Sequence, residues 1–308
     1  MISDFYDGMK VQGQFLVANA AKCVTNAGLT YYNVELKDAS GSISAKKWDA
    51  SKEDEDIFVA GNVVNIVANA LQYRDNLQLK ILEATKVDPD NIDFTVLLTP
   101  PPIPREVLEE KFNKFVESVQ DPDCKKLLEY FINKYSNELY VHPAGVSVHH
   151  EYSSGLLMHL TSMAELGDFL AVKYAPVNRD LLITGILLHD IGKITELEGP
   201  IVYHYSTEGK LLGHISIMVA EIRIAAKELN ITSEIPMLLE HMVLSHHDKP
   251  EFGSPIFPMI KEALLLTYID NMDSKMAIAG KALDAVEPGE FTQKIYPLDN
   301  RTLYKPKK

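Results

Sequence analysis

The sequence predicts two domains of different class, an all-β barrel followed by an all-α domain. Apolar and polar residues alternate with period two through much of the first 88 residues, whereas apolar residues recur with a helical period from residue 105 onward. A proline-rich stretch separates the two patterns. We therefore expect a barrel at 1–88, a linker at 89–104, a helical domain at 105–296 and a basic tail at 297–308.

The composition allows two cores and restricts the partners. The chain has 308 residues, of which 46% are hydrophobic, so it can bury sizeable cores. Its formal net charge of −13 argues against coating nucleic acid with bulk positive charge, so a polyanion must be met by local patches or by metal ions. Cys23 and Cys124 lie far apart and form no C-x-x-C pattern, which fits a reducing cytoplasm. No apolar stretch is long enough to cross a membrane.

The segment YYNVELKDASGSISAKKW predicts a β-hairpin with one buried face. Tyr32, Val34 and Leu36 alternate with other residues before a turn at 38–41, after which the alternation resumes. A second pair of strands, NVVNIVANALQY and NLQLKILEA, follows an acidic, helix-like stretch at 51–58. Five strands with one interposed helix indicate a small closed barrel.

This element order resembles an OB-fold, whose second and third strands commonly bind oligonucleotides. The predicted outer face carries rings for stacking on bases and cations for phosphates, namely Tyr31, Lys46, Trp48, Tyr73, Arg74 and Lys80. We expect this face to bind single-stranded RNA or DNA. The alternative is that Tyr31 and Trp48 pack against the second domain or a partner subunit.

The stretch between the domains contains Pro100, Pro101, Pro102 and Pro104, which cannot continue a helix or a central strand. Beyond it the apolar period predicts successive helices at 105–118, 122–136, 155–174, 178–190, 212–229, 234–246 and 259–280.

Histidines gather in the helical half of the chain. A lone histidine on a helix is usually structural, but several of these recur with aspartates at intervals of about one helix plus one loop. They are His159, His189, Asp190, His214, His246, His247 and Asp270. Successive antiparallel helices would bring one such group each to a common centre.

Imidazole and carboxylate groups without thiolates suit divalent first-row metals. A carboxylate can bridge two ions about 3.5–4 Å apart, which imidazole cannot, so Asp190 is the predicted bridge. Ligation would also remove the cost, roughly 1–3 kcal/mol each, of burying His189 and Asp190 without partners. We expect Gly192 to let the preceding helix stop, and His241 and Asp273 to support the ligands or to face solvent.

The motif LLHDIGK lies within an ordered set: HHEYSSGLLMH before it, then GHISIM, LSHHDKPEFGSPIFP and EALLLTYIDNMDSK after it. This set resembles the HD-domain superfamily of metal-dependent phosphohydrolases. Placed behind an OB-fold, it is similar to the YhaM-type 3′→5′ exoribonuclease family over nearly the whole chain. The Gly-Tyr-Pro signature of the cyclic-dinucleotide phosphodiesterases is missing, as are a P-loop, a Gly-x-Ser-x-Gly elbow and a Rossmann fingerprint.

The resemblance implies roles for particular positions. The defining metal ligands of the superfamily match His159, His189, Asp190 and Asp270. The additional histidines of its two-metal members match His214 and His246, with His247 as a further candidate. Lys193 matches a lysine that meets a substrate phosphate; the alternative is a solvated cation at a helix end. His149 and His150 are candidates for the substrate pocket, or else have capping or surface roles.

The resemblance also implies an activity. The protein would release nucleoside 5′-monophosphates from the 3′ end of single-stranded RNA, and of single-stranded DNA as a further substrate, with Asp190 and Lys193 as catalytic residues. Two divalent ions are expected, Mn²⁺ first, with Co²⁺, Fe, Ni²⁺, Zn²⁺ or Mg²⁺ as alternatives. Competing hypotheses are a phosphohydrolase of free nucleotides and a non-catalytic single-strand or DNA-binding factor. Metal identity, RNA or DNA preference and formation of a homo-oligomer stay open.

Overall fold

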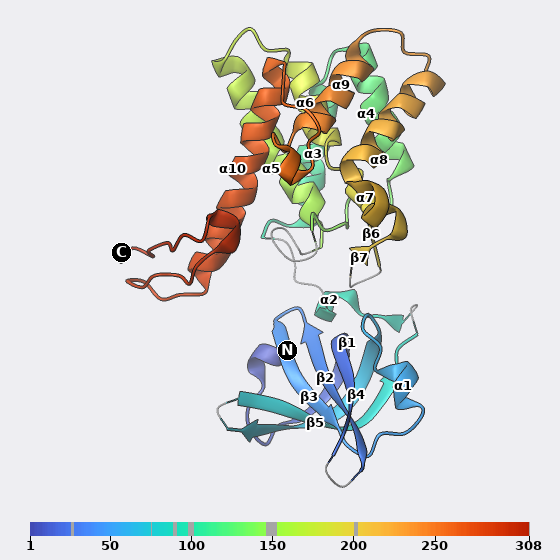
Figure 1. Ribbon diagram of the computed structural model, residues 1–308, viewed down its shortest axis with the longest axis vertical. Helices are drawn as coiled ribbons and strands as arrows, with labels where there is room; N and C mark the ends of the chain where they lie inside the picture. The colour runs from blue at the N-terminus through green and yellow to red at the C-terminus, as the bar shows by residue number, and fades with distance from the viewer. Residues whose placement is uncertain are drawn as a thin grey trace. The chain divides into compact units, whose positions relative to one another are not determined.

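The computed structural model describes residues 1–25, 28–74, 76–88, 91–97, 102–145, 153–199 and 203–307. The chain divides into two compact units, one of Met1–Pro100 with Gly199–Tyr203 and one of Pro101–Glu198 with His204–Lys308. The first contains a β-barrel and the second a bundle of helices (Figure 1). The predicted fold class is therefore confirmed.

The barrel consists of five strands and one short helix. They are β1 (Lys10–Val24), β2 (Thr30–Asp38), β3 (Gly41–Lys47), α1 (Asp54–Ile57), β4 (Val63–Tyr73) and β5 (Asn76–Lys86). The strands close in the order β1-β2-β3-β5-β4, with β3 and β5 parallel and the other neighbours antiparallel. A parallel pair requires a crossover, which α1 and β4 provide. This is the OB-fold topology that the sequence predicts.

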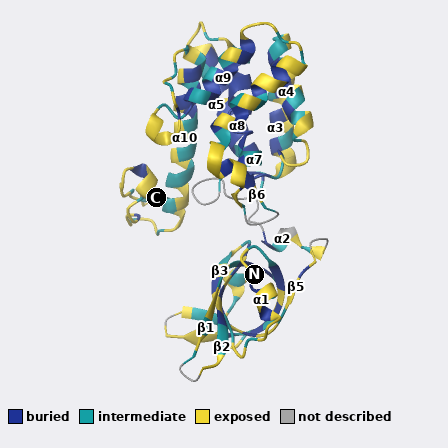
Figure 2. Ribbon diagram, turned by 45° about the vertical axis from the view of Figure 1, so that its right-hand side comes forward, coloured by how far each residue is buried: buried dark blue, intermediate teal, exposed yellow. Residues whose placement is uncertain are grey.

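The predicted hairpin alternates as expected. Tyr32, Val34 and Leu36 are buried in the barrel, while the residues between them are exposed. Figure 2 shows both buried and exposed stretches along the barrel strands. The turn depends on Asp38, which is only 3% exposed and whose carboxylate accepts hydrogen bonds from the backbone N–H groups of Ser40 (2.8 Å) and Ile2 (2.7 Å). The register of the hairpin therefore places alternate side chains inside the barrel and the side chains between them on its outer surface.

Part of the expected linker is packed on the barrel. Helix α2 (Phe94–Leu97) inserts Leu97, 2% exposed, into a cluster with Leu16 and Val63. The backbone N–H of Ala39 donates to the carbonyl of Val96 at 2.9 Å. An apolar side chain thus holds residues that the proline pattern assigns to a linker. Pro100 and Pro101 lie outside the described residues.

The second unit is mainly helical. Its helices are α3 (Arg105–Ser118), α4 (Pro122–Lys134), α5 (Gly155–Lys173), α6 (Arg179–Leu188), α7 (Lys193–Glu196), α8 (Thr207–Glu228), α9 (Ile235–Ser245) and α10 (Lys261–Asp284), with short 3₁₀ turns at Pro250–Phe252 (η3) and Tyr296–Leu298 (η4). A two-stranded sheet, β6 (Leu197–Glu198) with β7 (His204–Tyr205), is a small departure from an all-α domain. The expected tail also differs, because Arg301 and Tyr304 pair with Ile295 and Phe291.

Helix α6 lies in the core of this unit. Every residue from Leu181 to Leu188 is buried, because this helix is apolar on all sides. Its C-terminal end therefore delivers the next two residues, His189 and Asp190, to the interior, where they are 0% and 2% exposed. None of the helices in the described ranges combines the length and apolar character that a membrane crossing requires.

Candidate metal centre and nucleic-acid face

Five segments of the helical unit contribute to one centre. The structure brings together every predicted ligand from separate elements: His159 on α5, His189 and Asp190 after α6, His214 on α8, His246 and His247 after α9, and Asp270 on α10. His149 and His150 lie outside the described residues. Helix α8 begins earlier than predicted, because Ser206 caps it, and non-helical torsions at Gly213 (φ 71°) interrupt it just before His214.

Asp190 lies at the middle of this centre. Its Oδ2 is 3.6 Å from Nε2 of His159 and 3.5 Å from Nε2 of His189. Its Oδ1 is 3.4 Å from Nε2 of His214 and 3.9 Å from Nε2 of His246. The two oxygens of one carboxylate therefore face two different pairs of imidazoles, which is the arrangement a bridging ligand requires.

The donor atoms form overlapping groups. Within each group the atoms lie within 4.8 Å of one another, and the groups are His159 with His189 and Asp190, His189 with His246 and Asp270, and His214 with His246 and His247. His159 Nε2 also lies 3.3 Å from Asp270 Oδ1. Successive groups share His189 and His246, and the two oxygens of Asp190 face imidazoles of the first and the last group.

Backbone carbonyls fix the orientation of three of these rings. The Nδ1 atoms of His189, His246 and His247 lie 2.8, 2.7 and 2.7 Å from the carbonyl oxygens of Ile186, Val243 and Phe252. A carbonyl only accepts, so each Nδ1 carries the hydrogen and donates it. In the neutral ring the lone pair then lies on Nε2, which faces the centre.

Carboxylates orient the other two rings. His159 Nδ1 lies 2.7 Å from Asp273 Oδ2, and His214 Nδ1 lies 3.0 Å from Glu196 Oε1. Asp273 is one turn beyond Asp270 on α10, and of its two expected roles, support of a ligand or exposure to solvent, its contact with His159 favours support. Glu196 was missed by the sequence reasoning. Glu196 reaches His214 because α7 packs on α8, and no local period in the sequence predicts a contact of this kind.

The electrostatics of the centre favour cations. Burial would raise the pKa of Asp190, but Lys193 and the surrounding histidines hold it well below its usual range. Burial would lower the pKa of His159, yet Asp270 and Asp273 raise it to about 9. Burial is the main cause of the lowered pKa of His189 and His246, so these rings are neutral near pH 7. The carboxylates that favour a proton on His159 would also attract a metal cation.

Several buried atoms of the centre lack a hydrogen-bond partner among the described residues. They are Nε2 of His189, His214 and His246, together with Oδ1 of Asp190. Leaving such a group unsatisfied costs roughly 1–3 kcal/mol. All of them are metal donors, and nitrogen and oxygen donors without thiolates suit divalent cations. The residues present therefore fit a divalent metal centre.

Lys193 contacts this centre directly. Its Nζ is 2.6 Å from Asp190 Oδ2, and its side chain is only 12% exposed. The alternative of a solvated cation at a helix end is therefore wrong. The pKa of Lys193 is raised, because Asp190 outweighs the effect of burial, so the group is charged.

Gly192 has a different role from the expected one. Its φ of −55° is helical, and α6 has already ended at Leu188, so this glycine does not stop the helix. Instead, a Cβ at this position would lie 2.4 Å from the carbonyl oxygen of His214. Glycine is needed because the segment that carries His189 and Asp190 approaches the backbone of α8 closely here.

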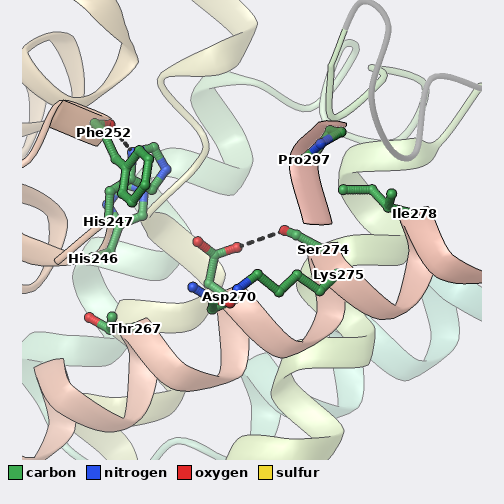
Figure 3. A pocket seen from close by; sticks show the side chains of 10 residues that line it. His246, His247, Phe252, Thr267, Asp270, Ser274, Lys275, Ile278 and Pro297 are labelled. Carbon is green, nitrogen blue, oxygen red and sulfur yellow. Dashed lines mark hydrogen bonds between the residues drawn. The ribbon is translucent and has the colours of Figure 1, made fainter. Parts of the chain in front are cut away.

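A pocket adjoins the centre (Figure 3). It has a volume of about 350 Å³ and is lined by His246, His247, Phe252, Thr267, Asp270, Asn271, Ser274, Lys275, Ile278 and Pro297. In Figure 3, Asp270 and Lys275 extend from α10 on one side, and the two histidines and Phe252 lie on the other. The candidate ligands are thus open to a bound molecule.

The predicted nucleic-acid residues cluster on the barrel. The rings of Tyr31 and Trp48 stack with centroids 4.7 Å apart, and Lys46 Nζ lies 5.6 Å from the Trp48 ring and 5.8 Å from the Tyr73 ring. Arg74 lies 5.5 Å from the Tyr73 ring. A cavity of about 250 Å³ is bounded in part by Lys46, Trp48, Tyr73 and Lys80.

Comparison with known proteins agrees with these features. The HD domain family model matches residues 156–275, so the fold and the site define an HD-domain protein with an OB-fold barrel earlier in the chain and with His and Asp groups that could bind a divalent metal. The 3′-5′ exoribonuclease YhaM of Geobacillus sp. (strain WCH70) is 43% identical over 97% of this chain and 93% of its own. Those of Oceanobacillus iheyensis and Bacillus velezensis are 43% and 40% identical over 97% of this chain, covering 95% and 96% of their own. The chain belongs to the YhaM family of 3′-5′ exoribonucleases.

Two solved structures are also similar to part of this chain. They are a domain of replication protein A from Methanococcus maripaludis and the second OB-fold domain of that protein, each 18% identical with a TM-score of 0.25. They cover 28% and 30% of this chain and 92% and 97% of their own. At these scores, the OB-fold assignment depends on the strand order of the barrel itself.

Replacing Gly192 tests the close approach between this residue and the His214 carbonyl. Gly192→Ala forces Cβ against the His214 carbonyl, so we expect a lower free energy of unfolding in urea. Gly280, on α10, has open space where its Cβ would stand, and Gly280→Ala should stabilise the protein by about 1 kcal/mol. Equal unfolding midpoints for the two variants would contradict this account.

Removing Glu196 tests the orientation of His214. Glu196→Ala takes away the acceptor of His214 Nδ1, and loss of such a supporting group typically weakens metal binding about 10- to 100-fold. Glu198→Ala is the matched control, because Glu198 is 60% exposed and pairs with His204 at the surface. Titration with Mn²⁺, followed through the electron spin resonance of the free ion, measures both. Unchanged affinity in Glu196→Ala would show that Glu196 does not orient a ligand.

Proposed function

We propose that this protein is a cytoplasmic, metal-dependent 3′-5′ exoribonuclease that hydrolyses single-stranded RNA, and single-stranded DNA as a further substrate, to nucleoside 5′-monophosphates. One observation carries the proposal: histidines anchored at Nδ1 direct Nε2 toward both oxygens of a buried aspartate. The names of the relatives support RNA as substrate and 3′ to 5′ as direction.

The chain offers ligands for two ions. One set would be His159, His189, Asp190 and Asp270, and the other Asp190, His214 and His246, with His247 beside them. Mn²⁺ is our first choice, and Co²⁺, Fe, Ni²⁺, Zn²⁺ or Mg²⁺ are alternatives, because such donors accept most of these ions. When bound, the ions lower the pKa of water and polarise the phosphoryl group.

The side chains would then order the reaction. A water oxygen joins the last phosphorus of the strand, the bond from this phosphorus to the 3′ oxygen of the preceding nucleotide breaks, and that oxygen takes a proton. Asp190 holds the reacting groups in register, since each of its oxygens faces a separate set of imidazoles. Lys193, fixed beside Asp190, supplies positive charge where the phosphoryl oxygens become more negative.

The barrel would hold the strand upstream of the cut. Rings stack on bases of any kind, and the cations beside them meet phosphates, so binding needs no positive charge on the whole protein. This explains how a chain with a net charge of −13 can handle RNA. The positive charge is local, on the barrel face and in the metal centre.

Digestion of labelled strands tests the activity. With 5′-labelled single-stranded RNA and DNA, we expect Mn²⁺ to give ladders that shorten from the 3′ end, and EDTA to abolish them. Asp190→Asn should lower the rate more than about 100-fold, beyond the effect of a residue that only supports a ligand. Asp284→Asn, exposed at the end of α10, is the control. Full activity of Asp190→Asn, or hydrolysis of free nucleotides alone, would reject the proposal.

The stacking face can be tested separately. Trp48→Ala should weaken binding of a long single strand by roughly 1–3 kcal/mol, because one stacking surface is lost. Tyr174→Ala removes an exposed ring, 56% accessible against 38% for Trp48, from the helical unit and should have no effect. Fluorescence anisotropy with labelled RNA, in EDTA to prevent cleavage, gives both dissociation constants. Equal values for the two variants would place the strand elsewhere.

A further inference from the structure

We propose that the pocket beside the metal centre binds the 3′-terminal nucleotide of the substrate, with Phe252 stacking on its base and Lys275 contacting its phosphate. The inference rests on the proposed nuclease function and adds the residues that would hold the nucleotide released in each cycle. The pocket and these two side chains are seen together in Figure 3.

The place and size of the pocket fit one nucleotide. Its wall includes His246, His247 and Asp270, so whatever fills it touches the metal centre. Its volume of about 350 Å³ lies at the small end of the range, about 300–1,000 Å³, typical of sites for small molecules. It can therefore take the end of a strand but not several stacked residues.

Phe252 is a fixed yet uncovered ring. It ends the 3₁₀ turn η3, its carbonyl accepts the Nδ1 hydrogen of His247 at 2.7 Å, and Gly253 follows with φ of 100°. The backbone of this ring is thus tied to a candidate metal ligand. The side chain is nevertheless 64% exposed, and no ring of the described residues pairs with it. An apolar ring held open beside a reaction centre is suited to stack on a base.

Lys275 provides the charge on the opposite wall. It lies on α10, which also carries Asp270, and its side chain enters the pocket (Figure 3). No carboxylate of the described residues pairs with Lys275, whereas Lys193 is paired with Asp190. A cation without such a pair is available for a phosphate oxygen. The phosphate of the terminal nucleotide would then lie between the metal centre and Lys275.

Such a subsite has a consequence for specificity. Stacking is tolerant of base identity, since every base has a π-face, and no hydrogen-bond reading is required. An enzyme that removes one nucleotide after another needs this tolerance at the position that changes each cycle. We therefore expect similar KM values for strands ending in different bases.

The stacking contact can be tested with strands that end in a normal or an abasic 3′ nucleotide. In the wild-type protein the abasic end should raise KM about 5- to 150-fold, the equivalent of one stacking contact. Phe252→Ala should raise KM for the normal strand similarly and no longer distinguish the two ends, while Phe252→Trp should restore the difference. Phe169→Ala, which removes a ring 67% exposed on α5, is the control. Equal KM values for both ends in the wild type would overturn the base contact.

The phosphate contact is tested by product inhibition. Lys275→Gln should weaken inhibition by adenosine 5′-monophosphate but not by adenosine, whereas Lys227→Gln, exposed on α8, should change neither. Equal weakening for both inhibitors, or none, would overturn the phosphate contact. A protein that cleaves RNA with unchanged discrimination in Phe252→Ala and Lys275→Gln rejects only the subsite. A wild-type protein without nuclease activity rejects the proposed function as well.

Discussion

The structure of the helical unit depends on the burial of one carboxylate, that of Asp190, which is 2% exposed. An ionised carboxylate in such a place is costly unless positive charge and hydrogen-bond donors surround it. Lys193 supplies the charge at 2.6 Å, and imidazoles from α5, α6, α8 and α9 supply the remaining contacts. The apolar helix α6 sets the depth of this group, and Gly192 permits the close approach of α8. The fold and the chemistry therefore share one constraint, because the segments that must meet to stabilise Asp190 are those that would bind metal.

The same constraint makes a negative net charge compatible with membership of a family of nucleases. Asp190, Asp270, Glu196 and Asp273 concentrate negative charge at the centre, where it attracts cations and fixes the imidazoles. The cations in turn would receive the phosphate. The barrel needs only a small number of exposed rings and basic side chains, such as Trp48 and Lys46, to hold a strand. In the proposed function, binding and hydrolysis therefore take place on separate surfaces.

Much of this arrangement could be predicted from the sequence, and the exceptions have physical reasons. Strands and helices repeat at regular intervals along the sequence. The alternation around Val34 therefore predicted the barrel, and the spacing of the histidines predicted that the groups from His159 to Asp270 meet at one centre. The contact of Glu196 with His214 depends on how α7 packs on α8, which no local period encodes. The prediction that Gly192 ends a helix was wrong. The residue must be glycine because the His214 carbonyl leaves no room for a Cβ, and sequence alone does not distinguish this requirement from a helix stop. Leu97 packs on the barrel although a run of prolines follows it, since burial of an apolar side chain outweighs the local signal for a linker.

The central claim is that Asp190 joins two metal ions. Anomalous scattering at the manganese edge, from crystals grown with Mn²⁺, measures this directly. The account predicts two peaks about 3.5–4 Å apart, one beside Oδ2 of Asp190 near His159 and His189, and one beside Oδ1 near His214 and His246. A single peak, or two peaks of which only one contacts Asp190, would contradict it.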